Sequence, residues 1–520
     1  MLFNSYPFVL AFLPLTWLIF FWAGTGSRRL GAVWLVLASI CFYGWWDVRF
    51  IPLLLGSIVF NFYSGVHLSR LSGTHSNKRS GYLLGAAVVA NLLLLSYFKY
   101  ANFFVSTWDE MTGAHWQLAA ILLPIGISFF TFTQIAYLVD AYRGLAREYN
   151  FIHYALFVTY FPHLVAGPIL HHKEMMPQFA KRATYNLNYR NLAVGLTMFV
   201  FGLAKKVLLA DNLVEYVRPV FDGPAGHAIG FLDGWGATLA YALELYFDFS
   251  GYSDMAIGLS LMFNVRLPVN FNSPYKAINI IDFWRRWHIT LSRFLRDYLY
   301  FPLGGNRRGR VRRYANLMVT MLLGGLWHGA GWTFIFWGGL HGVYLSINHA
   351  WRALRQRFGA DLGRSTLAGR TVARLTTFLA VIVAWVFFRA STIDEAMEIL
   401  RGMSGLNGFA LPATWLAKLG TGGAWLAAHG VQFVSGLSFG GIREAGWIAV
   451  PLAVAWLMPN TQELLARYRP TLEVASHKGA AASGPLAWRP GWQWGLIVGL
   501  VAFLAIANMT KPQVFLYFQF

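Results

Sequence analysis

Residues 7–46 read PFVLAFLPLTWLIFFWAGTGSRRLGAVWLVLASICFYGWW, which is two apolar runs, 7–23 and 30–46, joined by the short connection GTGSRR. A helix crosses the hydrocarbon core of a membrane with about 20 apolar residues, and each run approaches that length. No basic segment and no small-residue cleavage site accompany the first run, so we expect it to be retained rather than removed as a signal peptide. The stretch therefore predicts two membrane-spanning helices.

The composition of the whole chain agrees with this interpretation. Hydrophobic residues make up 57% of the 520 residues and charged residues only 12%, whereas an ordinary globular chain contains about 25% charged residues. One membrane bundle can absorb the whole length, so residues 1–520 are interpreted as a single membrane domain. The composition excludes a cytosolic enzyme and a disordered chain. Cys41 is the only cysteine, which excludes a disulfide scaffold.

The net charge of +20 is attributed to basic cytoplasmic loops rather than to nucleic-acid binding. Three more apolar runs are 51–67, 83–98 and 118–139. Basic residues follow the first, third and fifth runs, whereas acidic residues lie in the other loops. The basic set is Arg28, Arg29, Arg70, Lys78, Arg79, Arg143 and Arg147, and the acidic set is Asp47, Asp109 and Glu110. By the positive-inside rule, we expect the N-terminus to lie outside and these three basic loops to lie in the cytoplasm.

The rest of the chain predicts further spans and interrupted segments. Residues 151–170 contain Pro162 and Pro168 and are expected to enter and return rather than cross. Further spans are expected at 191–209, 232–249, 315–331, 333–349, 372–388, 446–458 and 494–507, with a short re-entrant segment at 251–263. Lys205 and Lys206, near the end of one span, fit the charge rule poorly.

These spans predict an all-α, polytopic transmembrane helical bundle. The total is about twelve crossings, an even number that also places the C-terminus in the periplasm. The bundle is divided into N-terminal helices at 7–140, a core with the functional motifs at 141–349, C-terminal helices at 350–509 and an aromatic tail at 510–520.

Two arginine-rich segments, 282–313 and 352–370, bracket the pair of spans at 315–349, and both are expected to be cytoplasmic. His328 lies in an apolar, glycine-flanked span, and His288 lies upstream at the expected membrane edge, beside arginines. Ionisable residues inside a membrane are costly and are therefore candidates for function.

A buried neutral imidazole can accept a proton from a hydroxyl, which acyl transfer to an alcohol requires because a neutral hydroxyl is a poor nucleophile. A histidine in a bundle can equally serve as a hydrogen-bonding residue between helices, and the residues alone leave both interpretations of His328 open. The sequence has no Ser-His-Asp order, Walker loop, GxGxxG motif or Cys/His metal spacing, which argues against a hydrolase, a nucleotide site and a zinc site.

Several strings occur together: LWHG (326–329), RWHITLS (286–292), FDFSGYSDMAIG (247–258), LPIGISFFTF (123–132), FPHLVAGPIL (161–170) and FWRRWHITLSRFLRDYLYFPLGGN (283–306). The combination resembles the membrane-bound O-acyltransferase (MBOAT) family, and within it the bacterial alginate O-acetyltransferases most of all. The resemblance implies that His328 is the family's near-invariant histidine and His288 the second histidine of the bacterial branch. It also implies a tunnel through the bundle, with the donor entering from the cytoplasm and the acceptor at the periplasmic mouth.

The same resemblance gives the arginines a candidate role. A coenzyme A donor carries phosphates, which guanidinium groups bind well. Arg285 and Arg286 adjoin His288 and are the candidates for binding it. The alternative is ordinary cytoplasmic arginine beside anionic lipid. We expect acetyl-CoA as the donor, although a carrier protein would also suit the arginines, and we expect no metal and no permanently bound cofactor.

Residues 514–520, VFLYFQF, form an aromatic tail without a charged side chain. One interpretation is an aromatic anchor at the membrane interface. The other is that the tail folds back into the tunnel mouth and presents Tyr517, whose phenol would need a base such as His328 to become nucleophilic. The resemblance favours this second interpretation, because it implies a C-terminal tyrosine that accepts the acyl group before a periplasmic partner takes it.

Asp248 and Asp254 can line the tunnel and orient an imidazole, or cap a helix near residues 250–251, and the structural role is favoured. The remaining histidines of interest are interpreted as packing or hydrogen-bonding residues: His163, His171 and His341.

The predicted function is a membrane O-acetyltransferase that moves acetyl from a cytoplasmic donor for O-acetylation of an exported polysaccharide, most of all alginate. The sequence contains no soluble polysaccharide-binding domain, so we expect a periplasmic acetyltransferase partner and only indirect contact with the polysaccharide. Membrane lipid is an expected partner, and nucleic acid is not. Cellulose, peptidoglycan and a teichoic-acid-like polymer stay open as acceptors. A polysaccharide or lipid permease without acyl transfer is the alternative of another class.

Overall fold

The computed structural model describes residues 1–71, 78–116, 118–148, 150–223, 229–359, 361, 365–472, 487–510 and 516. Within these residues the chain is mostly helical, and the two strands, β1 (Ala410–Pro412) and β2 (Gln432–Val434), form one short parallel pair. The predicted all-α class is confirmed, apart from this short pair of strands.

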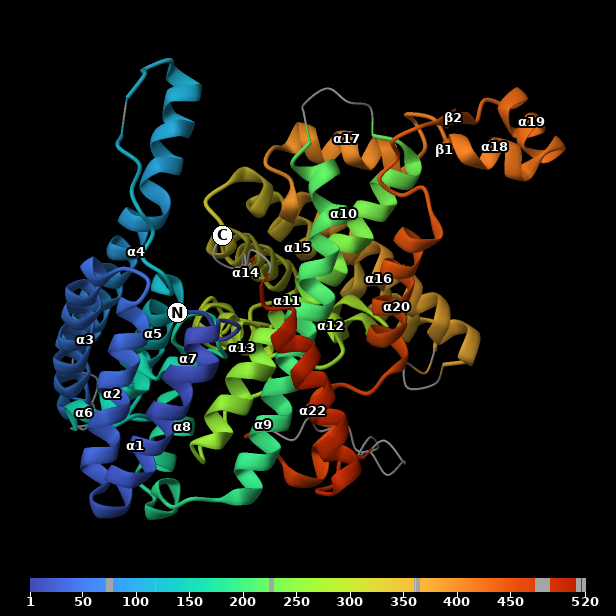
Figure 1. Ribbon diagram of the computed structural model, residues 1–520. Coiled ribbons are helices and arrows are strands. Elements are labelled where there is room, and N and C mark those ends of the chain that lie inside the picture. The colour runs from blue at the N-terminus through green and yellow to red at the C-terminus, as the bar shows by residue number, and fades with distance from the viewer. Residues whose placement is uncertain are drawn as a thin grey trace.

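The N-terminal helices form one side of the molecule (Figure 1). They are α1 (Leu13–Gly26), α2 (Arg28–Gly44), α3 (Ile51–Leu71), α4 (Lys78–Thr112) and α5 (Ile127–Tyr142). α4 is much longer than the apolar run 83–98 that predicted it, and it projects beyond its neighbours in Figure 1. α5 begins late because Pro124 and a left-handed Gly126 precede it, so residues 118–126 of the predicted span are not helical.

The centre of the molecule is an antiparallel pair of helices, α9 (Tyr189–Ala204) and α11 (Phe231–Met262). α9 continues through a π-helical turn (Lys205–Ala210) into α10 (Asp211–Phe221). The pair meets backbone to backbone, because a Cβ on Gly202 would lie only 2.6 Å from the carbonyl oxygen of Gly251. Small residues allow such close approach between membrane helices. α11 is one continuous helix, so the separate span at 232–249 and the re-entrant segment at 251–263 are wrong.

Short helices connect the long ones. α6 (Phe151–Thr159), α7 (Phe161–Leu164) and α8 (His172–Phe179) precede α9, and α12 (Ile280–Trp284) and α13 (Ile289–Leu295) follow α11. The chain breaks at Tyr160, just before Pro162, so residues 151–170 do not form one crossing helix, as expected from their prolines.

α14 (Arg310–His328) and α15 (Trp332–Arg357) form the hairpin that the spans 315–331 and 333–349 predicted. Gly325 and Gly338 allow this pair to pack closely, since a Cβ at either position would collide with the backbone of the other helix. The C-terminal helices are α16 (Leu367–Arg389), α17 (Ile393–Met403), α18 (Ala413–Leu419), α19 (Thr421–Ala428), α20 (Ile442–Leu457), α21 (Thr461–Leu464) and α22 (Trp492–Ala507).

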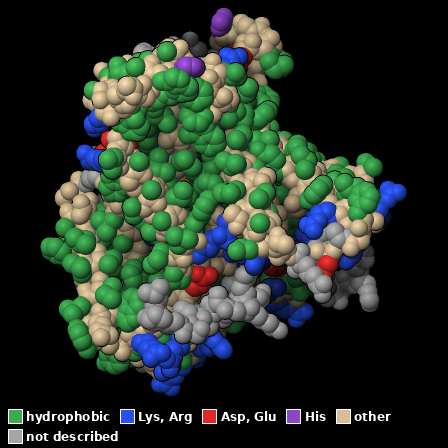
Figure 2. Space-filling model, turned by 90° about the vertical axis from the view of Figure 1, so that its right-hand side faces the viewer, with side chains coloured by type: hydrophobic (Ala, Val, Ile, Leu, Met, Phe, Trp, Pro, Cys, Tyr) green, Lys and Arg blue, Asp and Glu red, His purple; other side chains and the backbone are tan. Residues whose placement is uncertain are grey.

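Five described helical stretches are long and apolar enough to span a membrane: Pro7–Gly26, Val48–Leu71, Lys78–Thr112, Tyr189–Phe221 and Leu367–Arg389. α22 is apolar but shorter. Only 17% of the most apolar part of α4 is buried, so this helix turns apolar side chains outward. Figure 2 shows an outer face covered mainly by hydrophobic side chains, with Lys and Arg mostly in its lower half. The twelve crossings and the tunnel stay predictions.

Candidate active site

His328 is the last residue of α14. The helix ends there because Gly329 adopts an extended conformation, with φ −157° and ψ 152°. The side chain of His328 is buried, with 4% of its surface exposed. Three aromatic rings surround it, those of Trp327, Trp337 and Phe388, with centroids 5.0, 5.2 and 5.2 Å away. The imidazole therefore lies in an aromatic shell where α14 meets α15 and α16.

His288 is the N-cap of α13 and is fully buried inside the protein. Its φ of +43° is in the left-handed region, which a residue with a side chain rarely adopts and which is often found at functional sites. The surrounding structure therefore holds the backbone of His288 in a left-handed conformation that is unfavourable for a histidine.

Asn270 determines the protonation of the His288 ring. Its Oδ1 lies 3.1 Å from Nδ1 of His288 and also accepts hydrogen bonds from the backbone N–H and the hydroxyl of Thr290. A backbone N–H only donates, so this Asn270 atom must be the oxygen, and Nδ1 of His288 must donate to it. Nε2 is then the ring nitrogen that carries the lone pair in the neutral imidazole.

The two imidazoles are neighbours, with centroids 6.3 Å apart and planes at 65°. Trp327 contacts both rings and belongs to the hydrophobic cluster built on the N-terminal helices. Trp337 belongs to a second cluster, built on α10, α11, α15 and α16. The histidines thus lie where the two halves of the core meet. The structure brings both predicted residues into one site, and their catalytic roles stay predictions.

Lys99 of α4 also reaches this site, which the sequence analysis missed. Its ammonium donates to the carbonyl oxygens of Trp327 at 2.6 Å and His328 at 3.2 Å, and it lies 3.5 Å from Oγ of Ser128. A cation at the C-terminal end of α14 complements the helix dipole. The predicted span ended at Phe98, although a lysine inside the apolar string SYFKYANFF was an available signal.

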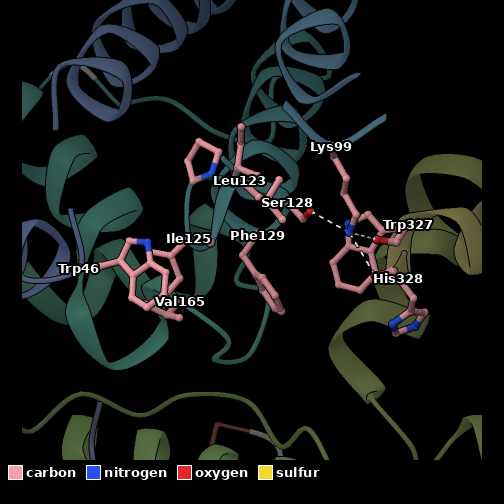
Figure 3. A pocket seen from close by; sticks show the side chains of 12 residues that line it. Trp46, Lys99, Leu123, Ile125, Ser128, Phe129, Val165, Trp327 and His328 are labelled. Carbon is pink, nitrogen blue, oxygen red and sulfur yellow. Dashed lines mark hydrogen bonds between the residues drawn. The ribbon is translucent and has the colours of Figure 1, made fainter. Parts of the chain in front are cut away.

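A small cavity of about 70 Å³ opens on His328. In Figure 3, Lys99 points toward Ser128 and the backbone of Trp327 and His328, and the facing wall is apolar. That wall consists of Trp46, Leu123, Pro124, Ile125, Gly126, Ile127, Phe129 and Val165. The cavity thus joins a buried imidazole and a fixed ammonium to the segment before α5.

The sequence model of the membrane-bound O-acyltransferase family, MBOAT, matches residues 40–388, which contain both histidines and Lys99. The chain belongs to this family. It is therefore a membrane protein and an O-acyltransferase, and the resemblance of its motifs is confirmed.

This MBOAT chain is 45% identical over 438 residues to the peptidoglycan O-acetyltransferase of Helicobacter pylori, covering 79% of the chain and 81% of that protein. It is 38% identical over 546 aligned residues to the probable alginate O-acetylase of Pseudomonas aeruginosa, covering both proteins in full. It is 26% identical over 319 residues to the teichoic acid D-alanyltransferase of Bacillus subtilis, covering 59% of the chain and 76% of that protein. All three names describe acyl transfer, but to different acceptors.

The predicted donor-binding arginines of the acyltransferase differ in accessibility. Arg285 is exposed after α12. Arg286 is partly buried, with Nε 2.9 Å from Oδ1 of Asp282 and a further hydrogen bond to the carbonyl of Asn272. The segment 282–313 is also not a simple surface loop, because α12 and α13 enter the bundle and bring His288 to His328. Donor binding stays a prediction for both arginines.

Asp248 and Asp254 lie inside α11, so the alternative that they cap a helix is wrong. Nζ of Lys206 lies 2.6 Å from Asp248, and Nζ of Lys205 lies 2.5 Å from Asp254. Lys206 also pairs with Asp211 at 2.7 Å. These ion pairs explain why two lysines that fit the charge rule poorly are tolerated inside the molecule.

The other predicted packing histidines have hydrogen-bond partners that suit that role. The ring of His163 bonds the carbonyl of Phe157 at 3.0 Å, and that of His171 bonds the hydroxyl of Tyr298 at 2.9 Å. Nδ1 of His341 accepts from the indole N–H of Trp284 at 3.3 Å. Within the described part of the chain, no group of three His, Cys, Asp or Glu is arranged to hold a metal ion.

Tyr517, the predicted acyl acceptor, lies outside the described residues. Its neighbour Leu516 is described, and it is buried with 6% exposure. The backbone N–H of Leu516 donates to Oδ2 of Asp248 at 3.3 Å. Asp248 precedes Phe249, whose ring centroid lies 4.9 Å from that of His288. At residue 516, the chain therefore lies against α11, next to the residue that packs on His288.

Proposed function

We propose that this O-acyltransferase is an O-acetyltransferase of the bacterial inner membrane. It takes acetyl from acetyl-CoA on the cytoplasmic side and passes it to the periplasmic side, where it is used to O-acetylate an exported polysaccharide. The observation that carries the proposal is the pair of buried imidazoles, 6.3 Å apart, beside a cavity.

In this proposal His328 is the base. It removes the proton from an acceptor hydroxyl, whose oxygen attacks the carbonyl carbon of the thioester. The carbon–sulfur bond breaks, and the leaving thiolate takes the proton from the imidazolium. His288 positions the thioester or assists the proton transfer through the Nε2 that Asn270 leaves unprotonated. Lys99 fixes the backbone that carries His328.

The first acceptor is Tyr517, which holds the acetyl as a phenolic ester. A periplasmic acetyltransferase partner then takes the acetyl and esterifies the polysaccharide. The position of Leu516 supports this route, because it brings the chain next to Tyr517 within reach of the helix that packs against His288.

The donor side is defined by the arginines. α14 has 19 residues, so at ~1.5 Å per residue its arginine-rich start lies about 27 Å from His328. Arg310, Arg312 and Arg313 mark the end that the positive-inside rule places in the cytoplasm, and both chain termini are then periplasmic. Arg285 and Arg286 bind the phosphates of the donor.

Alginate is the favoured polysaccharide, because the match to the Pseudomonas aeruginosa alginate protein covers both chains in full. Peptidoglycan is the second candidate acceptor, because the identity to the Helicobacter pylori protein is 45%. A strain lacking this gene separates them, since ester-linked acetate should disappear from only one of the two isolated polymers. The permease alternative has no support, because the chain belongs to an acyltransferase family.

Substitution of His328 by Gln should lower acetyl transfer at least ~100-fold, the usual contribution of a general base. The measurement is transfer of labelled acetyl from acetyl-CoA in purified membranes, with protein abundance from an immunoblot. The matched control is His341→Gln, which removes another buried imidazole packed on Trp337 and should keep most of the activity. Full transfer by His328→Gln at normal abundance would exclude His328 as the base.

Substitution of Tyr517 by Phe removes the phenol and keeps the ring, so it should abolish acetylation of the polysaccharide. Mass spectrometry of the C-terminal peptide should show one acetyl on Tyr517 in the wild type. Undiminished polysaccharide acetylation by Tyr517→Phe would reject the relay without affecting the role of His328.

A further inference from the structure

A groove separate from the histidine pair lies between the start of α9, the turn after α11 and two short stretches at residues 467–472 and 488–490. Four arginines from three of these segments line it: Arg190, Arg266, Arg467 and Arg469. We propose that this groove is a binding site for the phosphate groups of an anionic ligand.

The charge of the groove is the first argument. Among the described residues, no carboxylate forms an ion pair with any of the four arginines. Four cations around one concave surface repel one another. A bound anion would offset this repulsion, and guanidinium groups match the geometry of phosphate oxygens.

Trp488 is an independent second observation. Its side chain lines the groove and is buried, with only 5% of the residue exposed. Its indole Nε1–H has no hydrogen-bond partner in the described part of the chain. A buried donor without an acceptor is costly, and a phosphate oxygen would supply the missing acceptor. The ring is held against Tyr468, with centroids 5.0 Å apart and planes at 83°.

The backbone also fixes the arginines relative to one another. Arg469 has a left-handed φ of +46°, an unfavourable conformation for a residue with a side chain. In this conformation its carbonyl oxygen accepts a hydrogen bond from Nε of Arg266 at 3.0 Å. Two arginines that are far apart in the sequence are therefore joined at one edge of the groove.

The groove lies at the end of the molecule that is expected to face the cytoplasm. Asn264, just before Arg266, donates to the carbonyls of Thr184 and Asn186. Arg28, which belongs to the first basic segment and is expected to be cytoplasmic, donates to the carbonyl of Ala180. Ala180 lies just before Thr184 in the sequence, so these contacts are at the same end of the molecule. In Figure 1 the starts of α9 and α22 lie at the same lower end as the end of α1.

Phosphate at this end has two sources, the headgroup of an anionic phospholipid and the nucleotide part of coenzyme A. Both present the same oxygens to the four arginines, so the site is defined by its phosphate chemistry. Binding can be measured without acetyl transfer, and the inference therefore stands or falls separately from the proposed function.

The test uses the full-length chain in nanodiscs. The double substitution Arg467→Gln and Arg469→Gln removes two exposed charges from the groove. The control, Arg352→Gln with Arg357→Gln, removes two exposed charges from the end of α15. Retention of phosphatidylglycerol is measured by native mass spectrometry, and binding of coenzyme A is measured with the labelled compound. Phosphatidylcholine serves as the neutral lipid.

We expect the groove variant, but not the control, to weaken one of the two ligands by about 30-fold, from the usual contribution of two arginines at an anionic surface. Loss of phosphatidylglycerol retention identifies a lipid site, and loss of coenzyme A affinity identifies a site for the donor phosphates. Trp488→Phe, which keeps the ring and removes the N–H, should weaken the same ligand by about fivefold. Equal binding by groove variant, control and wild type would overturn the proposal.

Discussion

Two interior lysines, Lys99 in α4 and Lys206 in the turn that packs against α11, differ in the groups that surround their side-chain nitrogens. Lys206, which packs against α11, lies between two carboxylates, with Asp248 at 2.6 Å and Asp211 at 2.7 Å. Within the described residues, Lys99 of the outward-facing α4 donates only to neutral oxygens, the carbonyls of Trp327 and His328 and the hydroxyl of Ser128.

The difference separates structural charge from functional charge. A lysine paired with carboxylates compensates buried negative charge, and removing it leaves the carboxylates unpaired. A lysine held by neutral oxygens has no carboxylate to balance it and lies beside the candidate base, where its amine can act on a reacting group. The position of an ionisable residue within a span is therefore less informative than the chemistry of its acceptors.

Substitution of Lys206 by Met should have the largest effect of this comparison, on stability. It leaves Asp248 and Asp211 buried without their shared cation, and breaking such a pair costs about 3–5 kcal/mol. The expected outcome is a large fall in the melting temperature of the purified protein. Adding Asp248→Asn should recover part of the lost stability, because it removes one of the two buried carboxylates that Lys206→Met leaves unpaired. A Lys206→Met protein with wild-type thermal stability would show that Lys206 does not stabilise the fold through Asp248 and Asp211.

Substitution of Lys99 by Met should act mainly on catalysis. Acetyl transfer should fall about 10- to 100-fold, because the end of α14 that carries His328 loses its tether. The melting temperature should fall less than for Lys206→Met. Initial rates corrected for folded protein are the measurement, and Lys99→Arg, which keeps the charge, should retain more activity. An unchanged rate for Lys99→Met would show that Lys99 is structural, like Lys206.

Substitution of Asn270 by Ala should have a smaller effect, a loss of about tenfold in acetyl transfer, because the Nδ1–H of His288 loses the acceptor that sets its tautomer. Asn270→Asp keeps an oxygen there and should be more active than the Ala variant. The control is Asn272→Ala, whose amide binds Asn460 rather than an imidazole. Equal rates for Asn270→Ala and Asn270→Asp would show that the tautomer of His288 does not limit transfer.

The sequence was sufficient for the fold class and for the α14–α15 hairpin, because long apolar runs and arginine-rich loops report directly on the membrane environment. It was insufficient for α11. A re-entrant segment was expected from residue 251, whereas Gly251 and Gly258 are contact points with α9 in one continuous helix. A glycine that ends a helix and a glycine that allows close packing have the same local sequence signal, and only the neighbouring helix distinguishes them.

The candidate site was predicted in part. His328 and His288 were chosen from their motifs, and the structure places them together. The burial of His288 could not be foreseen, because the arginines around it indicated a surface loop. Lys99 lay one residue beyond a predicted boundary, and its partners come from α5 and α14. Both the burial of His288 and the place of Lys99 in the site depend on contacts between segments that are far apart in the sequence.

Asp248 has a consequence for how the C-terminal tail is studied. The same carboxylate balances the charge of Lys206 and accepts the N–H of Leu516. Removing the tail therefore also deprives a buried acid of a donor, and the disturbance extends through Lys206 to Asp211. A truncated chain that has lost activity reports on the ionic core as well as on Tyr517. The single-atom change in Tyr517→Phe leaves that core intact and isolates the chemistry of the phenol.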